Sequence, residues 1–544
     1  MSERYWVKER DWKEHIDVLV VDGYVDEPGL LGVPPYISPE PRMLVGVADE
    51  LDLTWEYVTI DEYREYGLPL GDIVLVHGGV TVPGKYLSGQ PLSVEEALEI
   101  SDQPGETYLG GPLARYSEVS GYDHLVEKDL AAYFYDSLFG EGVDRWAEAE
   151  EREDWLKFGA KTVKRHLMFP DPLLAEIETF RGCPRYIVGG CSFCSEPVYG
   201  KPQFREQEDI IEEMGLLYDY GIRHFRLGGQ SCIFSYKAEG VGEVETVKPR
   251  PSELEELFSG IVDRCPDIKV LHVDNANPAV MSKYRDESME ILETLIEYCT
   301  AGNVIALGLE SADEKVIEKN NLNSDPQETK EAVRITNRVG ADAGDNGMPE
   351  LLPGINFLGG LIGECEETYE KNLEFLKELL EEELLLRRIN IRQVMGGDEW
   401  KVDKRNFQYF KKRVREQIDR PMLKKILPEG RVLRDVYMEK HDEGITFGRQ
   451  IGSYPLLVGV RYELELGRYY DIKLTEYGYR SVTGIHQPFY LDEASFKELQ
   501  AVPGIGKKRA GKIFTEQPKS EGELEELLED RRSFEKIMEY VEFK

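Results

Sequence analysis

Short apolar runs alternate with amphipathic stretches along the first part of the chain. Such runs span residues 15–24, 54–61 and 72–80, and a helix-like stretch covers 41–51. The strands of a parallel sheet with helices on both faces are nearly all apolar, because neither face meets water. The alternation therefore predicts an α/β fold that begins with a Rossmann-like domain over residues 1–110.

A longer alternation of the same kind fills residues 176–395. Its apolar runs follow amphipathic helical stretches, and glycine or polar residues stand where each run ends. The runs begin near residues 176, 222, 268, 304, 355 and 385. Six such units predict a central partial (β/α)6 barrel, with an active site at the carboxyl ends of its strands.

The segments on either side of this barrel have different patterns. Residues 111–175 are rich in charged and aromatic residues and predict a helical linker without chemistry of its own. After the barrel, residues 396–440 predict a basic linker, residues 441–488 a small β-barrel with glycine turns, and residues 489–544 a helix-hairpin-helix.

Charge modifies this picture in one place. The 544 residues carry a formal net charge of −38, which disfavours nucleic-acid binding by the surface as a whole and indicates a solvated surface, as in a high-salt cytoplasm. Between residues 401 and 434, however, lysine and arginine gather with Phe407, Tyr409 and Phe410. This mixture suits a nucleic-acid backbone and its bases, and it fits a solvated helix on an acidic surface equally well.

No apolar segment is long enough to span a bilayer, and the first ten residues lack the apolar core of a signal peptide. We therefore expect a cytoplasmic protein with no membrane partner.

Three of the seven cysteines, Cys183, Cys191 and Cys194, stand in one glycine-rich loop. An odd count with such a cluster indicates reduced thiols and a metal rather than disulfides. A tetrahedral zinc site would need a fourth cysteine or histidine at matching spacing, and none follows soon after Cys194. Three cysteines on an iron–sulfur cluster leave one iron open to a ligand. The loop alone leaves zinc and iron–sulfur open, although the trio favours catalysis.

The loop resembles that of the radical S-adenosylmethionine (SAM) superfamily. The residues Glu-Thr-Phe-Arg-Gly-Cys-Pro around Cys183 and the aromatic Phe193 before the last cysteine carry the similarity. The spacing is Cys-x7-Cys-x2-Cys, whereas the family has Cys-x3-Cys-x2-Cys, and an outward bulge of the loop accommodates four extra residues. The resemblance covers residues 176–395 and implies a [4Fe-4S] cluster on Cys183, Cys191 and Cys194, with SAM as second cofactor.

The same resemblance implies SAM contacts at five strand ends. Gly228-Gly229-Gln230 stands where the family has Gly-Gly-Glu, whose backbone receives the SAM amino group; glutamine weakens the charge assistance but keeps an acceptor. The other implied positions are Phe193, Asn275, Glu310, Ser311, Gly359, Gly360, Arg392 and Gln393. Any one glycine pair alone is explained by a turn, but five positions in register with the cysteines are not. The implied reaction is reductive cleavage of SAM to a 5′-deoxyadenosyl radical, with ferredoxin or flavodoxin as electron donor.

The remaining cysteines divide by position. Cys232 and Cys365 follow strand ends, so we expect them near the active site, where each is a candidate catalytic thiol on the substrate side, with a packing role as the alternative. Cys265 and Cys299 precede strands and are expected to be packing residues, as free cysteines more often are.

The N-terminal domain resembles the cobalamin-binding-like domains that precede many radical SAM barrels. It lacks their Asp-x-His-x-x-Gly motif, and His77 stands at a strand end in a different context. It also lacks the cysteines of the auxiliary cluster in methylthiotransferases. We expect the fold with neither cofactor, and either a ligand or a domain interface at the loop 22–36.

The C-terminal segments resemble nucleic-acid-binding modules. The strands of residues 441–488 resemble the TRAM barrel of archaeal-type, methylthiotransferase-related enzymes. Residues 499–514 carry a helix-hairpin-helix signature, which implies a phosphate site at the start of a helix. The residues of this site are Gly504, Gly506, Lys507, Lys508 and Arg509, with the cations aimed outward.

These features lead to one main hypothesis and two alternatives. The main hypothesis is a radical SAM enzyme that modifies a nucleic acid, most of all tRNA, held by the C-terminal modules. The first alternative is a radical SAM enzyme that acts on a protein or small metabolite and uses the C-terminus for assembly. The second is a non-enzymatic iron–sulfur binding protein.

Overall fold

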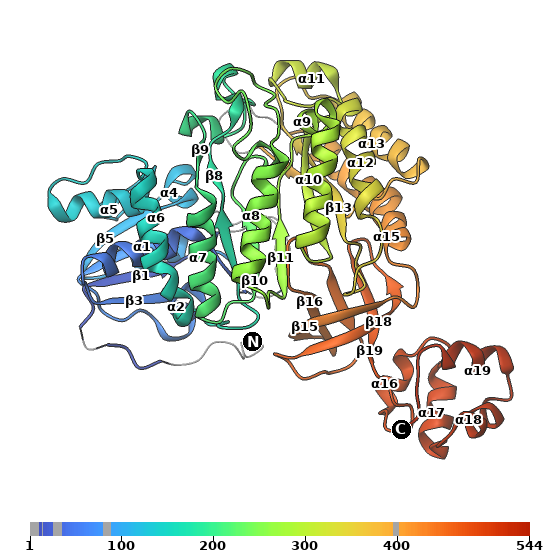
Figure 1. Cartoon of the computed structure of the whole chain (residues 1–544). Helices are drawn as coiled ribbons and strands as arrows, with labels where there is room; N and C mark the ends of the chain where they lie inside the picture. Colours follow the sequence, from blue (N-terminus) through green and yellow to red (C-terminus); the bar gives the residue numbers. More distant parts are fainter. Residues whose placement is uncertain (1–9, 14, 26–34, 80–86, 88, 395–401) are drawn as a thin grey trace.

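Two parallel sheets, a closed β-barrel and a C-terminal group of helices follow one another along the chain (Figure 1). The computed structural model describes residues 10–13, 15–25, 35–79, 87, 89–394 and 402–544. Most of the predicted loop 22–36 lies outside the described residues.

The first sheet is parallel, with strand order β3-β1-β4-β5-β6. Its strands are β1 Val18–Asp22, β3 Trp55–Thr59, β4 Ile73–His77, β5 Glu106–Gly110 and β6 His124–Leu125. The helices around it are α1 Pro39–Glu50, α2 Ile60–Tyr66, α3 Val94–Ile100, α4 Pro112–Tyr116, α5 Leu130–Phe139 and α6 Ala149–Phe158. All five residues of β1 are buried, as expected for a central strand covered on both faces. The predicted Rossmann-like α/β fold is confirmed.

Residues 111–175 pack closely on this sheet. β6 extends the sheet beside β5, and α6 lies against α1. The backbones of the two helical segments nearly touch, because a Cβ atom on Gly46 would lie 1.9 Å from the carbonyl oxygen of Trp155. Glycine is therefore required at this crossing.

The second sheet system is the six-stranded partial barrel. Its strands are β7 Leu174–Glu178, β10 His224–Gly228, β11 Val270–Val273, β12 Asn303–Glu310, β13 Leu351–Gly359 and β14 Arg388–Gln393. Its helices are α7 Gln207–Asp219, α8 Pro251–Arg264, α9 Pro278–Lys283, α10 Arg285–Tyr298, α11 Glu314–Lys319, α12 Pro326–Gly340 and α13 Glu366–Glu381. The strands form the groups β11-β10-β7 and β12-β13-β14, which a parallel bridge between Ala276 and Leu307 connects. The predicted barrel is confirmed.

One strand of the barrel comes from the N-terminal region. The two-residue strand β2, Tyr36–Ile37, pairs in parallel with β7 and so extends the barrel sheet at its first edge. Directly after it, Arg42 of α1 is fully buried and contacts the carboxylate of Glu213 on α7. Arg42 also donates to the carbonyl oxygen of Glu176, at 2.5 Å. A strand contributed by the N-terminal region and a buried ion pair between α1 and α7 thus link the two parts of the chain.

The C-terminal β-barrel is also confirmed, with closed order β15-β16-β17-β19-β18. Its strands are β15 Val432–Asp442, β16 Ile445–Gln450, β17 Leu457–Val460, β18 Tyr469–Tyr477 and β19 Ser481–Gln487. The helical segments before it are α14 Lys404–Val414, the π-helical turn Arg415–Asp419 and α15 Arg420–Ile426. Those after it are α16 Phe496–Ala501, α17 Lys507–Glu516, α18 Glu521–Leu528 and α19 Arg531–Met538.

A loop of this β-barrel enters the six-stranded barrel. Tyr454, between β16 and β17, packs on Val304 and Ala306 of β12 and donates to Asp274 Oδ2 at 2.9 Å. The backbone N–H of Ser453 donates to Nδ1 of the buried His272 at 2.9 Å. Nδ1 must therefore be unprotonated, so this contact between the two barrels requires a neutral histidine. We call the contact between Ser453 and His272 the His272 joint.

The His272 joint predicts a pH dependence of stability. Burial holds the pKa of His272 at about 4, below the ordinary value of 6.5. The unfolded chain therefore takes up a proton below pH 6.5 while the folded chain does not, so stability present above pH 6.5 is lost as the pH falls toward 4. We expect thermal unfolding midpoints to fall over this range, and to fall less in His272→Gln, which keeps an acceptor without titrating. Equal slopes in the two proteins would contradict this assignment.

Candidate active site

The cysteine loop lies at the carboxyl end of β7, between the short paired strands β8 Phe180–Arg181 and β9 Gln203–Phe204. The longer spacing accommodates a five-residue 3-10 turn, Pro184–Val188, that ends at Gly189 in the left-handed region, with φ of 81°. Ile187 and Val188 at its tip are 38% and 45% exposed, so the turn projects outward. The longer spacing between Cys183 and Cys191 therefore does not separate the three cysteines, because the additional residues lie outside the site.

The three thiols occupy a partly buried site. Burial raises the pKa of Cys183, raises that of Cys191 to about 11 and raises that of Cys194 to about 12. The thiols also raise one another's pKa through space, which shows that they share one site. Thiolates here are unfavourable unless a metal group compensates their charge. The donor set therefore fits a metal cluster.

The separation of the sulfur atoms distinguishes the two metal sites left open by the sequence. A tetrahedral zinc ion, with Zn–S bonds of about 2.3 Å, would hold its sulfur ligands about 3.8 Å apart. The three Sγ atoms do not all lie within 4.8 Å of one another, although the structure describes all three cysteines. As they lie here, the three sulfur atoms are too widely spaced to be joint ligands of a single tetrahedral zinc ion.

Two asparagines hold the cysteine loop against the barrel, and sequence reasoning missed them. Asn321 donates through Nδ2 to the carbonyl oxygen of Gly190 at 2.7 Å, and its own carbonyl accepts from Arg185 at 2.8 Å. Arg185 also reaches Cys191 Sγ at 3.0 Å. Asn320 accepts the N–H of Ile362 from the loop after β13, at 3.1 Å. Their only signal in the sequence was an Asn-Asn pair after a short helix.

The structure corrects the expectation for Gln230. Its side chain is fully buried, accepts from Thr179 at 3.2 Å and donates to the carbonyl oxygens of Leu227 and Asp274 at 3.0 and 2.9 Å. These bonds occupy the amide, so it offers no acceptor to a ligand. The side chain instead fixes the turn that presents Gly228 and Gly229, whose backbone lines a cavity.

Asn275 and Glu310 lie at neighbouring strand ends, both in the left-handed backbone region with φ of 62° and 65°. Asn275 donates to the carbonyl oxygen of Gln230 at 3.0 Å, and this bond links two of the predicted positions. Burial raises the pKa of Glu310 to about 8, and Glu310 lies close enough to Cys191 to raise the pKa of that thiol. Strained backbone at strand ends is typical of binding sites.

The next predicted positions, Gly359, Gly360 and Ser311, lie at the ends of β12 and β13. A Cβ atom on Gly359 would lie 2.6 Å from the ring of Phe407, so a side chain at this position would point toward α14. The implied SAM contact of its backbone stays a prediction. Gly360 has a φ of 94° and donates its N–H to Glu364 at 2.9 Å. Ser311 is buried and accepts the N–H of Asp313.

Phe193, Arg392 and Gln393 complete the set of predicted contacts. Phe193 belongs to an apolar cluster with Leu358 of β13, Leu361 of the loop after β13, and Cys191. Gln393 pairs with Gly359 at the end of β14 and is exposed, and Arg392 lies one residue before it. These residues surround the same strand ends, but Arg392 belongs to a separate cationic group described below.

The two candidate catalytic thiols have opposite environments. Cys232 is 3% exposed, accepts the N–H of Asn277 at 3.2 Å, and burial raises its pKa to about 11. It is a packing residue, which corrects the expectation of a substrate-side thiol. Cys365 is exposed at the start of α13, where hydrogen bonds from Thr368 lower its pKa. Its catalytic role stays a prediction.

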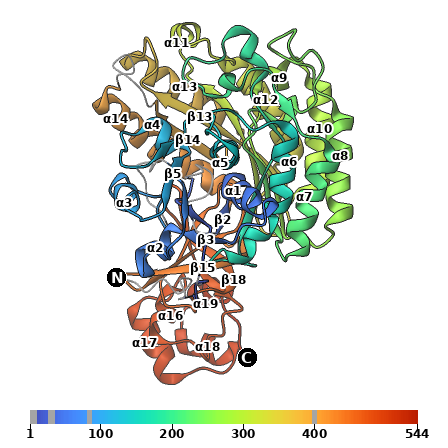
Figure 2. The same cartoon turned by 90° about the vertical axis from the view of Figure 1, so that its left-hand side faces the viewer.

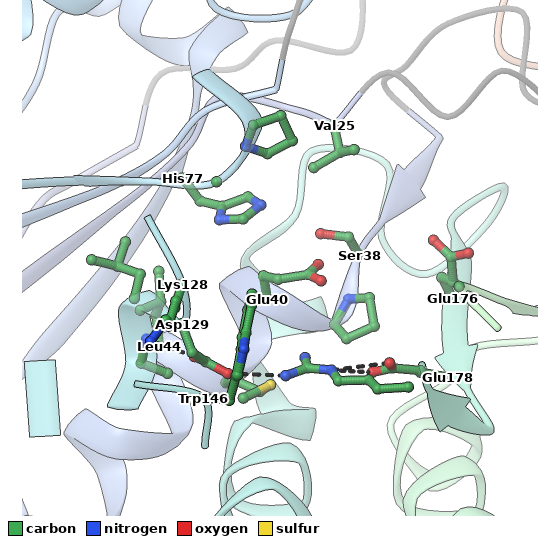
Figure 3. A pocket seen from close by; sticks show the side chains of 18 of the residues that line it. Val25, Ser38, Glu40, Leu44, His77, Lys128, Asp129, Trp146, Glu176 and Glu178 are labelled. Atoms are coloured by element: carbon green, nitrogen blue, oxygen red, sulfur yellow. Dashed lines mark hydrogen bonds and ion pairs between the residues drawn. The ribbon is translucent and has the colours of Figure 1, made fainter. Parts of the chain in front are cut away.

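A cavity of about 370 Å³ lies between the first sheet and the start of the six-stranded barrel (Figure 3). Glu40 from α1, Glu196 beside the cysteine loop and Gly228 and Gly229 line it. His77 lines it too, and although it is only 5% exposed, neither ring nitrogen has a hydrogen-bond partner. Burial raises the pKa of Glu196 to about 7. The cavity thus contains a buried imidazole without a hydrogen-bond partner and, two residues after Cys194, the carboxyl group of Glu196, which accepts the N–H of Gly182 at 3.1 Å.

A network of buried ion pairs lines part of this cavity. Arg181 bonds Asp129 at 3.0 Å and Glu178 at 3.0 Å, and Arg152 bonds Glu178 at 2.7 Å. Burial opposes the charge on Glu178, but the three arginines around it, the third being Arg205, keep its pKa below the usual value. The network holds the end of β7 to the segment before it.

Residues 111–175 take part in this cavity, contrary to the expectation that they carry no chemistry. Arg115, Lys128, Asp129 and Trp146 line it, and the Trp146 ring lies 4.3 Å from that of Tyr199. The sequence offered no signal for this role, because it depends on how α5 and α6 fold back over the cysteine loop.

The family model of the Radical SAM superfamily matches residues 177–376, and that of the helix-hairpin-helix motif matches residues 492–515. The matched segment includes the cysteine loop and four of the five later strands. The chain contains a domain of the radical SAM superfamily.

Several proteins resemble this radical SAM enzyme over different spans. An uncharacterized protein of Methanocaldococcus jannaschii is 44% identical over 86% of this chain and 92% of its own length. The ribosomal protein uS12 methylthiotransferase RimO of Porphyromonas gingivalis is 24% identical over 45% of this chain and 47% of its own length. The tRNA-2-methylthio-N(6)-dimethylallyladenosine synthase of Buchnera aphidicola is 24% identical over 38% and 41%.

Among solved structures, the radical SAM methyltransferase TsrM of Kitasatospora setae aligns with a TM-score of 0.45 at 14% identity, over 69% of this chain and 72% of TsrM.

Enzymes of this superfamily use a [4Fe-4S] cluster and SAM, and the protein therefore takes these cofactors. When bound, the cluster supplies the electron that cleaves SAM. Cys183, Cys191 and Cys194 would hold it, and the Arg185 guanidinium beside Cys191 would stabilise its negative charge. The apolar contact of Phe193 with the loop after β13 would keep water from the same side of the site.

Proposed function

We propose that the protein is a radical SAM enzyme that modifies RNA, with tRNA as its substrate and a ferredoxin or flavodoxin as electron donor. The observation that carries the proposal is the pair of C-terminal modules after the barrel, a closed β-barrel and a helix-hairpin-helix. The distant similarity to a tRNA enzyme supports it, and the similarity to RimO keeps a ribosomal protein as the alternative to be tested. In the part of the chain that the structure describes, no helix is long and apolar enough to cross a membrane.

The helix-hairpin-helix presents two free cations. Gly504 makes the turn with a φ of 90°, and Gly506 is the N-cap of α17. Lys507 and Lys508 are exposed at the start of α17 and form no ion pair with any described carboxylate. Arg509 is different, because it donates to the carbonyl oxygen of Gly504 at 2.9 Å and to Asp530 at 3.1 Å. Contrary to expectation, Arg509 holds the hairpin together, so the phosphate site is reduced to two lysines.

The basic segment before the β-barrel contributes less than its sequence implied. Phe407 and Phe410 are buried against Tyr369 and Phe357, and only Tyr409 is exposed. Stacking of bases on the first two rings is therefore excluded. The cations of α14 also pair in part with acids, for example Arg413 with Glu370.

Charge reversal of the lysine pair tests the proposal. We expect Lys507→Glu/Lys508→Glu to weaken binding of an unmodified tRNA transcript at least about tenfold and to flatten its salt dependence, because two phosphate contacts are lost. Fluorescence anisotropy on the full-length protein with its cluster provides the measurement. A matched control is Arg461→Glu/Arg468→Glu, which reverses two exposed cations of the β-barrel that pair with Glu476 and Glu465.

Two outcomes would count against an RNA substrate. Wild-type protein that binds no RNA at any salt concentration at which it is folded would refute the proposal. So would tRNA nucleosides that are identical, by mass spectrometry, in the parent strain and in a strain without the gene. Unchanged activity of the lysine variant on a protein substrate would support the alternative.

A further inference from the structure

Cations gather along the last strand of the radical SAM barrel, where it meets the C-terminal β-barrel. They come from β14, from the α14 segment with its π-helical turn, and from the turn between β18 and β19. We call them the arginine cluster; its members are Arg387, Arg388, Arg392, Lys411, Arg415 and Arg480. Six neighbouring cations stand out in a chain that has 104 acidic and 66 basic residues.

These cations oppose one another. Burial, together with neighbouring guanidinium groups, lowers the pKa of Arg387 and Arg388 to about 10. Arg480 is exposed, and the like charges of Arg388, Arg392 and Arg415 act to lower its pKa. Burial and three arginines also lower the pKa of Lys411. Groups held close with like charge cost stability when no ligand is bound.

Acidic residues compensate this charge only in part. Asp419 lies within the cluster, where it contacts Arg415. Arg392 and Arg480 form no ion pair with any carboxylate of the described residues. Since surface acids are abundant in this protein, the absence of partners here leaves a local surplus of positive charge that an anionic ligand would offset.

The backbone orders the cluster along a line. Arg388 and Arg392 share one face of β14, because side chains alternate along a strand, and they are separated by about 13 Å at 3.3 Å per residue. The Arg388 guanidinium lies 4.6 Å from the centre of the Tyr454 ring, and Arg387 donates to the Tyr454 carbonyl oxygen at 2.8 Å. Arg415 donates to the carbonyl oxygen of Ile389 at 3.3 Å. Backbone carbonyl oxygens thus help to position Arg387 and Arg415, and Asp419 also contacts Arg415.

The cluster lies between the C-terminal modules and the active site. In both views α16 to α18 are at the foot of the molecule and α11, near the cysteine loop, is at the top (Figures 1 and 2). Strand β14 begins beside the inserted Tyr454 and ends at Gln393, which pairs with Gly359. An RNA held by Lys507 and Lys508 must pass along this distance to reach the cysteine loop.

We propose that the arginine cluster binds the phosphodiester backbone of the RNA and guides it from the C-terminal modules to the barrel opening. This inference rests on the proposed function, since it takes RNA as the ligand. The planar guanidinium fork matches phosphate geometry, and a row of such groups follows a flexible strand without reading its sequence.

The test uses Arg480→Ala and Lys411→Ala in the full-length protein with its cluster, and a fluorescent unmodified tRNA transcript. Each variant is expected to bind several-fold more weakly, whatever the RNA sequence, and to reduce the slope of log affinity against log salt by about 0.7–0.9. Arg468→Ala is the matched control, an exposed arginine of the same β-barrel that pairs with Glu465 at 2.7 Å, and it should leave the slope unchanged.

Thermal unfolding separates binding from folding. Without RNA, Arg480→Ala is expected to unfold at the wild-type temperature or above, because one like charge is removed. With RNA, it should gain less stability than the wild type. Should the alanine variant unfold early, Arg480→Lys keeps the charge and is expected to keep the salt slope.

The outcomes distinguish this inference from the proposed function. RNA binding by all variants with the wild-type slope would overturn the arginine cluster as an RNA site and leave the RNA enzyme standing. Wild-type protein that binds no RNA would overturn both. Polyglutamate provides the competing ligand. If the wild-type protein binds it more tightly than the transcript, and Arg480→Ala no longer binds it, the cluster is a site for an acidic peptide and the proposal is overturned.

Discussion

Cys194→Ala is expected to abolish iron–sulfur binding and SAM cleavage together. Burial raises the pKa of Cys194 to about 12. Its thiolate therefore forms only when a metal compensates the negative charge. With two thiolates left, the loop cannot hold three irons while the fourth stays open to SAM. Iron and sulfide content of anaerobically reconstituted protein, and 5′-deoxyadenosine formed after reduction, should both fall to background.

Cys299→Ala is the matched control for this experiment. Cys299 follows α10 and precedes β12, away from the cysteine loop, so iron content and SAM cleavage should stay at wild-type levels. Full iron content in Cys194→Ala, or equal losses in both variants, would contradict the assignment of the three ligands.

Arg42→Met is expected to lower the free energy of unfolding by about 3 kcal/mol. Arg42 and Glu213 are both fully buried, and removing one partner of such a pair leaves the other charge without full compensation. Arg205 still contacts Glu213 at 2.7 Å, which keeps the loss at the lower end of the usual range. Denaturant unfolding followed by tryptophan fluorescence measures the change.

Lys161→Met provides the comparison. Lys161 bonds Asp49 at 2.6 Å near the same helices, but the two side chains are 38% and 22% exposed, so solvent screens the pair. The expected loss is below about 1 kcal/mol. A loss in Arg42→Met no larger than in Lys161→Met would show that the buried pair does not hold the two sheets together.

The strands and the cysteine site were accessible from sequence because their signals are local. Fully apolar runs such as β1 predict buried parallel strands, and three cysteines in one loop predict a metal. The direction in which a residue points is not determined by its neighbours in the sequence. The direction of Gly359 toward Phe407, and the use of the Gln230 amide within the barrel, depend on neighbours distant in the chain.

Contacts between distant parts of the chain also determine which residues of 111–175 line the cavity and which aromatic rings of the basic segment are buried. Trp146, in the loop between α5 and α6, and Asp129, just before α5, line the cavity because they contact Tyr199 and Arg181 of the cysteine loop region. Phe407 and Phe410 follow an amphipathic helical pattern, which gives one apolar face, and that face turned toward the core. Cations and aromatics that alternate along a sequence can therefore lie on opposite sides of a helix.

Strand β2 has a consequence for how the chain acquires its structure. Because β2 precedes α1 yet pairs with β7, the chain leaves the first sheet, adds an edge to the second and returns. The pairing closes a long loop, so it forms late in folding. A fragment that begins at the barrel would expose the free edge of β7, and unpaired edges promote association between chains. Expression of the barrel alone should therefore yield aggregates, and the smallest folding unit should include the N-terminal region.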